Sequence, residues 1–279
     1  MIEINSLEEL YTYLENNRIL IYGAGYIGDN IFYSGLKKKG LDYNVVSFVT
    51  TTGSDQKVDG LEVRCIDDID SSDDYLICIA VHDSILQDIV DNLEKRGFKK
   101  YLWITPFRFQ ILLGKPKAKG IDVSLKKIWS SERKRISIPT RLLVVEQFYG
   151  NNTCGYDIYR HHLNLFEKSE KTSQHRLKSF INLIQSVEQL GMDDTECIAI
   201  TQNGDIIDGA HRVSLAIWFR YKYVRCDIYD ASDDYRKIHC EASSPDIENA
   251  DKLGFNNSEV REIERIRDII DKQIETLNI

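Results

Sequence analysis

The sequence predicts an α/β protein of two domains, an N-terminal parallel sheet covered by helices and a C-terminal α+β domain. The first 104 residues alternate short apolar segments, typical of buried strands, with amphipathic segments typical of helices. A basic stretch that holds two of the four prolines then interrupts this alternation, as connectors do. Beyond it, a strand–turn–strand pattern leads directly into the apolar segment VSLAIWF at 213–219. The chain of 279 residues also exceeds the roughly 250 residues at which single cores stop growing.

The N-terminal domain is expected to span residues 1–115. Its first helix, at 6–16, begins with a serine cap and repeats leucine at helical spacing, and the apolar segment RILIY at 18–22 predicts a buried strand. The later elements are expected to be a helix ending near residue 39, strands at 44–49, 61–65 and 75–80, a helix at 84–96 and a strand at 101–104. Strands that alternate with helices favour a parallel sheet.

The C-terminal half is expected to consist of a linker at 116–140, a domain at 141–240 and a helical tail at 241–279. The linker is predicted from the basic segments KPKAKG and SERKRISIP. The expected elements after it are a strand at 142–145, an amphipathic helix at 176–190, strands at 196–201 and 205–208 that form a hairpin, a helix from 209, a strand at 223–229 and a helix at 258–277.

Composition excludes several classes of function. The net charge of -8 and the pI of about 5.4 argue against a nucleic-acid partner. No run approaches the ~20 apolar residues that a membrane span needs, and the N-terminus is acidic, so we expect a cytoplasmic protein without a membrane span. The cysteines are scattered without a CxxC pair, which favours buried reduced thiols over a zinc or disulfide framework. They are Cys65, Cys78, Cys154, Cys197, Cys226 and Cys240.

A glycine-rich turn, Gly23-x-Gly25-x-x-Gly28, lies between the first expected strand and the helix after it. In this context small residues let the backbone approach a pyrophosphate, which a helix N-terminus attracts. Dinucleotide sites of this kind also place an acidic residue at the end of the second strand, where this chain has Thr50-Thr51-Thr52. NAD is therefore not expected. The glycines predict either a second nucleotide site or only close packing of a helix on the sheet.

The same domain resembles a known type of module. The pattern YGAGxxG, a second strand similar to "GFV" and the IDDI stretch at 66–69 resemble the short Rossmann-like modules at the front of many bacterial surface-polysaccharide proteins. The resemblance implies a Rossmann-like fold and a role in surface-polysaccharide biosynthesis. Modules of this type are not generally redox enzymes.

A second motif, Asp208-Gly209-Ala210-His211-Arg212, joins an expected strand to an expected helix. Free N–H groups at a helix start, together with a guanidinium and an imidazole, form a compact cradle for phosphate oxygens. Asp208 would complete this cradle as a magnesium ligand. The motif therefore predicts a phosphate-binding site.

This segment resembles the ParB/sulfiredoxin superfamily, in which a helix, a strand, a turn and then DGxHR build a nucleotide-phosphate pocket. Residues 186–191 and 205–212 match that order, and Gln174-His175-Arg176 stands where the family has a polar loop before its first helix. The resemblance covers roughly residues 165–230. It implies that the nucleotide-binding residues are Gly209, Ala210, His211, Arg212, His175 and Arg176.

Two branches of that superfamily, the sulfiredoxins and the ParB proteins, do not match this sequence. Sulfiredoxins carry a reactive cysteine immediately before the His-Arg pair, where this chain has Ala210, so sulfiredoxin activity is excluded. ParB proteins continue into a DNA-binding region with a basic surface, whereas this chain continues into an acidic helix. Chromosome partitioning is therefore not expected.

The remaining branch resembles free-serine kinases, which transfer a phosphoryl group from a nucleotide to a small hydroxyl compound. This resemblance implies ATP or ADP with Mg²⁺, bound by Asp208, and a catalytic carboxylate in the loop before the first helix. Glu170 is the candidate for that carboxylate, with Glu167 in reserve, and a solvated charged loop is the alternative interpretation. The expected catalytic set is Glu170, Asp208, His211 and Arg212.

Three functions follow from these motifs. The first is a nucleotide-dependent kinase acting on a small-molecule or sugar-nucleotide substrate, in surface-polysaccharide assembly and with self-association left open. The second is a regulatory or scaffold protein that senses nucleotide without turnover. The third is an NAD-dependent oxidoreductase built on the glycine-rich turn, against which the missing ribose acid counts.

Overall fold

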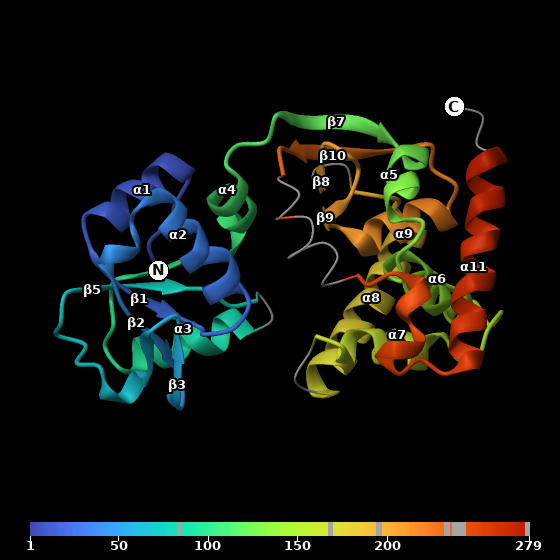
Figure 1. The fold of residues 1–279 in the computed structure, drawn as a ribbon. Helices are drawn as coiled ribbons and strands as arrows, with labels where there is room; N and C mark the ends of the chain where they lie inside the picture. The colour runs from blue at the N-terminus through green and yellow to red at the C-terminus, as the bar shows by residue number, and fades with distance from the viewer. Residues whose placement is uncertain (83–84, 167–169, 194–196, 232–234, 236–243, 277–279) are drawn as a thin grey trace. The chain divides into compact units, whose positions relative to one another are not determined.

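A computed structural model describes residues 1–82, 85–166, 170–193, 197–231, 235 and 244–276 (Figure 1). The protein is mixed α/β, as the sequence predicts, and divides into two compact units, Met1–Lys115 and Pro116–Ile279. Among the described residues, no helix is both long enough and apolar enough to span a membrane.

The first unit is built on a six-stranded sheet with the order β3-β4-β2-β1-β5-β6. All neighbouring strands run parallel except β3, which pairs antiparallel with β4. The strands are β1 Arg18–Tyr22, β2 Val45–Thr50, β3 Ser54–Val58, β4 Leu61–Cys65, β5 Tyr75–Ile79 and β6 Tyr101–Trp103.

Helices cover both faces of this sheet, and each face has its own apolar core. Figure 1 shows α1 and α2 on one side and α3 on the other. The helices are α1 Leu7–Glu15, the π-helix η1 Ile27–Tyr33, α2 Ser34–Lys39, α3 Leu86–Lys95 and α4 Arg108–Leu113. Single 3₁₀ turns lie at Asp42–Asn44, Ile66–Asp68 and Thr105–Phe107.

The second unit combines a four-stranded sheet of order β7-β10-β8-β9 with a set of helices around one large core. β10 is antiparallel to β7 and parallel to β8, and β8 forms a hairpin with β9. The strands are β7 Ala118–Ser124, β8 Ile198–Thr201, β9 Ile206–Asp208 and β10 Tyr223–Tyr229. The helices are α5 Leu125–Glu132, α6 Ser137–Phe148, α7 Gly155–Asn164, α8 Glu170–Leu190, α9 Ala210–Trp218 and α11 Asn257–Thr276, with 3₁₀ turns at Ile247–Asn249 and Asp251–Leu253.

The structure corrects the expected linker at 116–140. That stretch forms β7, α5 and the beginning of α6, and its apolar residues Val123, Leu125 and Ile128 belong to the core. The expected strand at 142–145 is also wrong, because those residues are the interior of α6 and all four are buried. A short apolar run buried on every side does not distinguish a strand from a helix.

Two further corrections concern helices. The helix expected to begin at Arg176 begins at Glu170, so Gln174, His175 and Arg176 are helical and do not form a polar loop. The expected helical tail is not an appendage, because α11 contributes Ile263, Ile266, Ile270 and Ile274 to the core of the second unit.

Replacing a core isoleucine of α11 tests this packing. We expect Ile266→Ala to lower the free energy of unfolding by about 2–5 kcal/mol, since the side chain is 2 % exposed and its loss leaves a cavity. Ile269→Ala, on the same helix but 43 % exposed, should cost less than about 1 kcal/mol. Urea unfolding followed by circular dichroism measures both values, and equal costs would contradict the packing of α11 in the core.

Candidate functional site

The glycine-rich turn of the first unit follows β1, and two of its three glycines are required by packing alone. A Cβ on Gly23, which has a φ of +113°, would lie 2.8 Å from the carbonyl oxygen of Ala80. A Cβ on Gly28 would lie 1.8 Å from the carbonyl oxygen of Gly23. A Cβ on Gly25 has nothing within 4 Å, so Gly25 borders open space. Only Gly25 remains to be explained by a ligand.

The surroundings of this turn are poorly suited to a dinucleotide. The helix after it carries Asp29 in its first turn, and a carboxylate there occupies the position that favours a phosphate. At the end of β2, the hydroxyl of Thr50 accepts a hydrogen bond from the Gly53 N–H at 2.9 Å, and Thr51 pairs with the hydroxyl of Tyr22 at 2.9 Å. These threonines stabilise the turn and supply no carboxylate for a ribose.

We expect no saturable NADH binding, because this strand end lacks a carboxylate and Asp29 opposes a pyrophosphate. Titration followed by NADH fluorescence is the measurement. Gly25→Val is the matched variant, since open space at Gly25 lets the fold accept the side chain while a ligand would meet it. Saturable binding that Gly25→Val abolishes would restore the dehydrogenase hypothesis.

The second motif forms a strand-to-helix turn in the second unit. β9 ends at Asp208, Gly209 adopts the left-handed conformation with a φ of +96°, and α9 begins at Ala210. A Cβ on Gly209 would lie 3.1 Å from two carbons of Ile198, so close packing on β8 also favours glycine. The turn therefore presents the first N–H groups of α9 together with His211.

His211 lies where α7, α8 and α9 meet. Its Nε2 is 2.6 Å from the hydroxyl oxygen of Tyr159, and its ring centroid is 4.4 Å from that of Phe180. Burial lowers the pKa of His211 well below its usual range, and the positive charges of Arg141 and Arg176 lower it further. The imidazole is therefore neutral at pH 7.

Three arginines, from α6, α8 and α9, act electrostatically on this imidazole. Arg141 donates to the carbonyl oxygen of Ser137 at 2.8 Å and to its Oγ at 2.7 Å, and its guanidinium carbon lies 5.5 Å from the ring centroid of Tyr159. Its Nε is buried without a hydrogen-bond partner among the described residues. Burial lowers the pKa of Arg141 below its usual range, Tyr159 opposes the shift, and Arg176 adds to it by like-charge repulsion.

Arg212, the third of these arginines, lies on α9. Its Nη2 donates to the backbone carbonyl of Cys197 at 3.3 Å, beside Gly209. It nevertheless contributes to the positive potential at His211. The structure therefore brings Asp208, Gly209, Ala210, His211, Arg212 and Arg176 to one region of the second unit, and adds Arg141 and Tyr159, which the sequence analysis missed.

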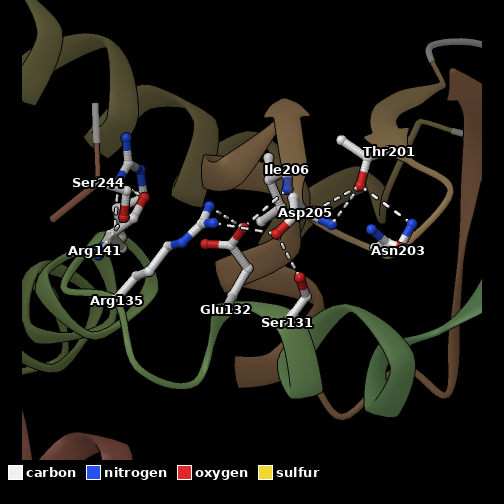
Figure 2. Close-up of polar contacts among 10 residues, drawn as sticks. Ser131, Glu132, Arg135, Arg141, Thr201, Asn203, Asp205, Ile206 and Ser244 are labelled. Carbon is white, nitrogen blue, oxygen red and sulfur yellow. Dashed lines mark hydrogen bonds and ion pairs between the residues drawn. The ribbon is translucent and has the colours of Figure 1, made fainter. Parts of the chain in front are cut away.

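Figure 2 shows a buried ion cluster in the same unit, drawn together with Arg141. Arg135 donates to Glu132 at 3.2 Å and to Asp205 at 3.1 Å, and all three side chains are at most 5 % exposed. Asp205 also accepts hydrogen bonds from Ser131 and Thr201, and Glu132 accepts the N–H of Ile206 at 2.9 Å. The cluster joins the turn between α5 and α6 to the β8–β9 hairpin.

Glu170, the candidate catalytic carboxylate, is the exposed first residue of α8. It accepts hydrogen bonds from Arg160, Asn164 and Gln174, each at 3.2–3.3 Å. On a helix, the six-residue offset between Glu170 and Arg176 corresponds to about 240° of rotation, so the two point to different sides. Its catalytic role stays a prediction. Glu167, the reserve candidate, lies outside the described residues, and His175 is exposed on α8.

The adjacent histidines His161 and His162 lie in the last turn of α7. His162 is buried and pairs through Nδ1 with the hydroxyl of Thr140 at 2.8 Å. His161 stacks on Phe255 with ring centroids 4.1 Å apart. Within the described residues, no group of three or more His, Cys, Asp or Glu side chains is arranged to hold a metal ion.

The cysteines show no sign of activation in the part of the chain that the structure describes. Cys78 and Cys226 are buried, and burial raises the pKa of Cys226 to about 12. Cys65, Cys154 and Cys197 are half-buried free thiols, and burial also raises the pKa of the last two. Cys240 lies outside the described residues.

Comparison of the chain with protein-family models, curated proteins and solved structures finds no match.

Arg135→Met tests the ion cluster. Removal of the guanidinium leaves two buried carboxylates, which should cost about 3–5 kcal/mol of unfolding free energy at pH 7. Burial already raises the pKa of Glu132. A carboxyl whose pKa is raised in the folded state favours folding most below its unfolded pKa, and it loses that contribution as the pH rises. The free-energy cost of Arg135→Met should therefore become smaller as the pH is lowered from 7 to 5.

Urea unfolding at several pH values measures this cost. The control is Arg133→Met, whose side chain is 60 % exposed and pairs with Asp271, and which should cost no more than about 1 kcal/mol. A pH-independent cost for Arg135→Met would contradict the electrostatic explanation.

Proposed function

We propose that the second unit is a nucleotide-dependent phosphotransferase that binds phosphates at the start of α9 and acts on a small or sugar-linked hydroxyl. The observation that carries this proposal is the placement of Arg141 and Arg176 near His211, at the start of α9. Burial lowers the pKa of Arg141, and repulsion from Arg176 lowers it further. Clustered cations that are partly withdrawn from water are unfavourable unless an anion binds among them. A polyphosphate supplies that anion.

Two carboxylates act electrostatically on Arg141. Glu132 interacts electrostatically with Arg141, but its side chain is hydrogen-bonded to Arg135 and to the Ile206 N–H. Asp208 also acts electrostatically on Arg141 and stands directly before the turn into α9. Arg141, Arg176 and Arg212 add to the effect of burial in lowering the pKa of His211, and such a positive potential favours the phosphates of ATP or ADP.

Asp208 is also the residue that would hold Mg²⁺. Magnesium sites that work with nucleotides use one or two protein carboxylates and complete their octahedron with phosphate oxygens and water. A single aspartate beside a phosphate cradle fits that donor set. The bound ion would neutralise charge on the phosphates, while Arg141 and Arg176 would orient them and the first N–H groups of α9 would donate to their oxygens.

A nucleotide sensor without turnover is the second candidate. The position of Glu170 favours it, because this carboxylate is hydrogen-bonded to Arg160, Asn164 and Gln174 and not to the cationic cluster. A kinase needs a carboxylate beside the acceptor hydroxyl, whereas a sensor does not. The expectation of a surface-polysaccharide pathway depends only on the resemblance of the first unit.

Arg141→Gln tests the cradle. We expect the affinity for Mg²⁺-ATP or Mg²⁺-ADP to fall about 10–100-fold, since a hydrogen bond to a charged group contributes about 1.5–3 kcal/mol. Isothermal titration calorimetry measures the affinity, and Arg261→Gln, an exposed arginine of α11, is the matched control and should bind normally. Unchanged affinity in Arg141→Gln would place the nucleotide elsewhere.

Asp208→Asn separates binding from catalysis. We expect a folded protein that still binds ADP without metal and loses about 10³-fold of its ATP turnover, because the metal that stabilises the transferred phosphoryl group is lost. The assay follows ADP formation with a pool of amino-acid and sugar hydroxyl compounds. Glu170→Gln should bind nucleotide within about twofold of the wild type, and its predicted low turnover tests the acceptor-side role. Absence of turnover in the wild type would support the sensor.

A further inference from the structure

Tyr159 and His211 form a buried hydrogen bond that fixes the orientation of the imidazole ring. Tyr159 is fully buried, so its phenol is held in place by the core, and its hydroxyl oxygen lies 2.6 Å from Nε2 of His211. Phe180 packs on the imidazole with its centroid 4.4 Å away. The ring therefore has a fixed orientation with Nε2 toward α7.

The other ring nitrogen has different surroundings. Nδ1 of His211 makes no hydrogen bond with the described residues. A neutral imidazole carries one N–H, and its two nitrogens have opposite roles. The role of Nε2 in its hydrogen bond with Tyr159 therefore decides the role of Nδ1: if Nε2 accepts, Nδ1 carries the hydrogen and donates.

We propose that Tyr159 is a positioning residue that donates its hydroxyl hydrogen to Nε2 and so holds His211 in the neutral Nδ1–H tautomer, with that N–H directed to a phosphate oxygen. The phenol hydroxyl is a good donor and the imidazole nitrogen a good acceptor, which favours this direction of the hydrogen bond. His211 then acts as a donor to phosphate and not as a general base. This inference rests on the proposed function for its ligand but not for its tautomer.

The charges that face His211 agree with a neutral ring. They come from Arg141 on α6, His162 on α7, Arg176 on α8 and Arg212 on α9, and each of them disfavours an imidazolium. A neutral donor adds a hydrogen bond to phosphate without adding another repelling charge. The arginines attract the phosphate by their charge, and the N–H of His211 orients it by a hydrogen bond.

The experiment is a long-range ¹H–¹⁵N spectrum of the histidine rings in the ligand-free protein at pH 7, with His211 assigned from the signals lost in His211→Asn. We expect a single neutral tautomer with the hydrogen on Nδ1. The Nε2 resonance should shift in Tyr159→Phe and stay in place in Tyr156→Phe, a control on the half-buried side of the same helix. An Nε2–H tautomer or an imidazolium in the wild type would overturn the inference.

A titration with Mg²⁺-ADP completes the test. The Nδ1–H resonance should shift on saturation, and Tyr159→Phe should weaken ADP binding about tenfold, as expected for loss of one oriented hydrogen bond to a charged ligand. If ADP binds but leaves the His211 signals unchanged, the positioning role is wrong. If ADP does not bind at all, the proposed function fails, whereas the tautomer is decided separately by the ligand-free spectrum. The wild-type spectrum also decides the tautomer if Tyr159→Phe does not fold.

Discussion

The buried contact of Arg135 with Glu132 and Asp205 is the constraint on which the candidate site depends. It joins the corner between α5 and α6 to the hairpin of β8 and β9. Arg141 follows Arg135 into α6, and His211 follows Asp205 through β9 into α9. Buried ion pairs add little net stability but penalise arrangements that separate them. The cluster therefore fixes the position of α6, which carries Arg141, relative to the start of α9, which carries His211.

Most of the first unit could be predicted from the sequence because its central strands are buried on both faces. Such strands appear as short continuous apolar runs between turn residues, as in RILIY and YLICI. β3 gave no such signal, since SDQKV is a polar edge strand held by pairing with β4. Its structure is set by its neighbour and not by its own side chains.

The second unit was harder to predict because residues 116–140 have the basic, proline-containing composition of a connector and yet form β7, α5 and the start of α6. Pro139 suggested a connector, yet it occupies the first turn of α6, where a missing N–H costs nothing. The DGAHR turn was found because its signal is local. Arg141 and Tyr159 come from helices distant in sequence, and only the three-dimensional packing brings them to His211. A single arginine in the apolar segment of α6 was the one available hint.

The distribution of acceptors explains why the positive potential at His211 persists. Arg135 is matched by two carboxylates, whereas Arg141 is anchored by the neutral carbonyl and hydroxyl of Ser137. A carboxylate in place of Ser137 would hold Arg141 equally well but would cancel its charge. The neutral anchor orients the guanidinium and leaves its charge available. The charge of Arg135 is therefore met by carboxylates within the protein, whereas the charge of Arg141 would be met by the proposed anion.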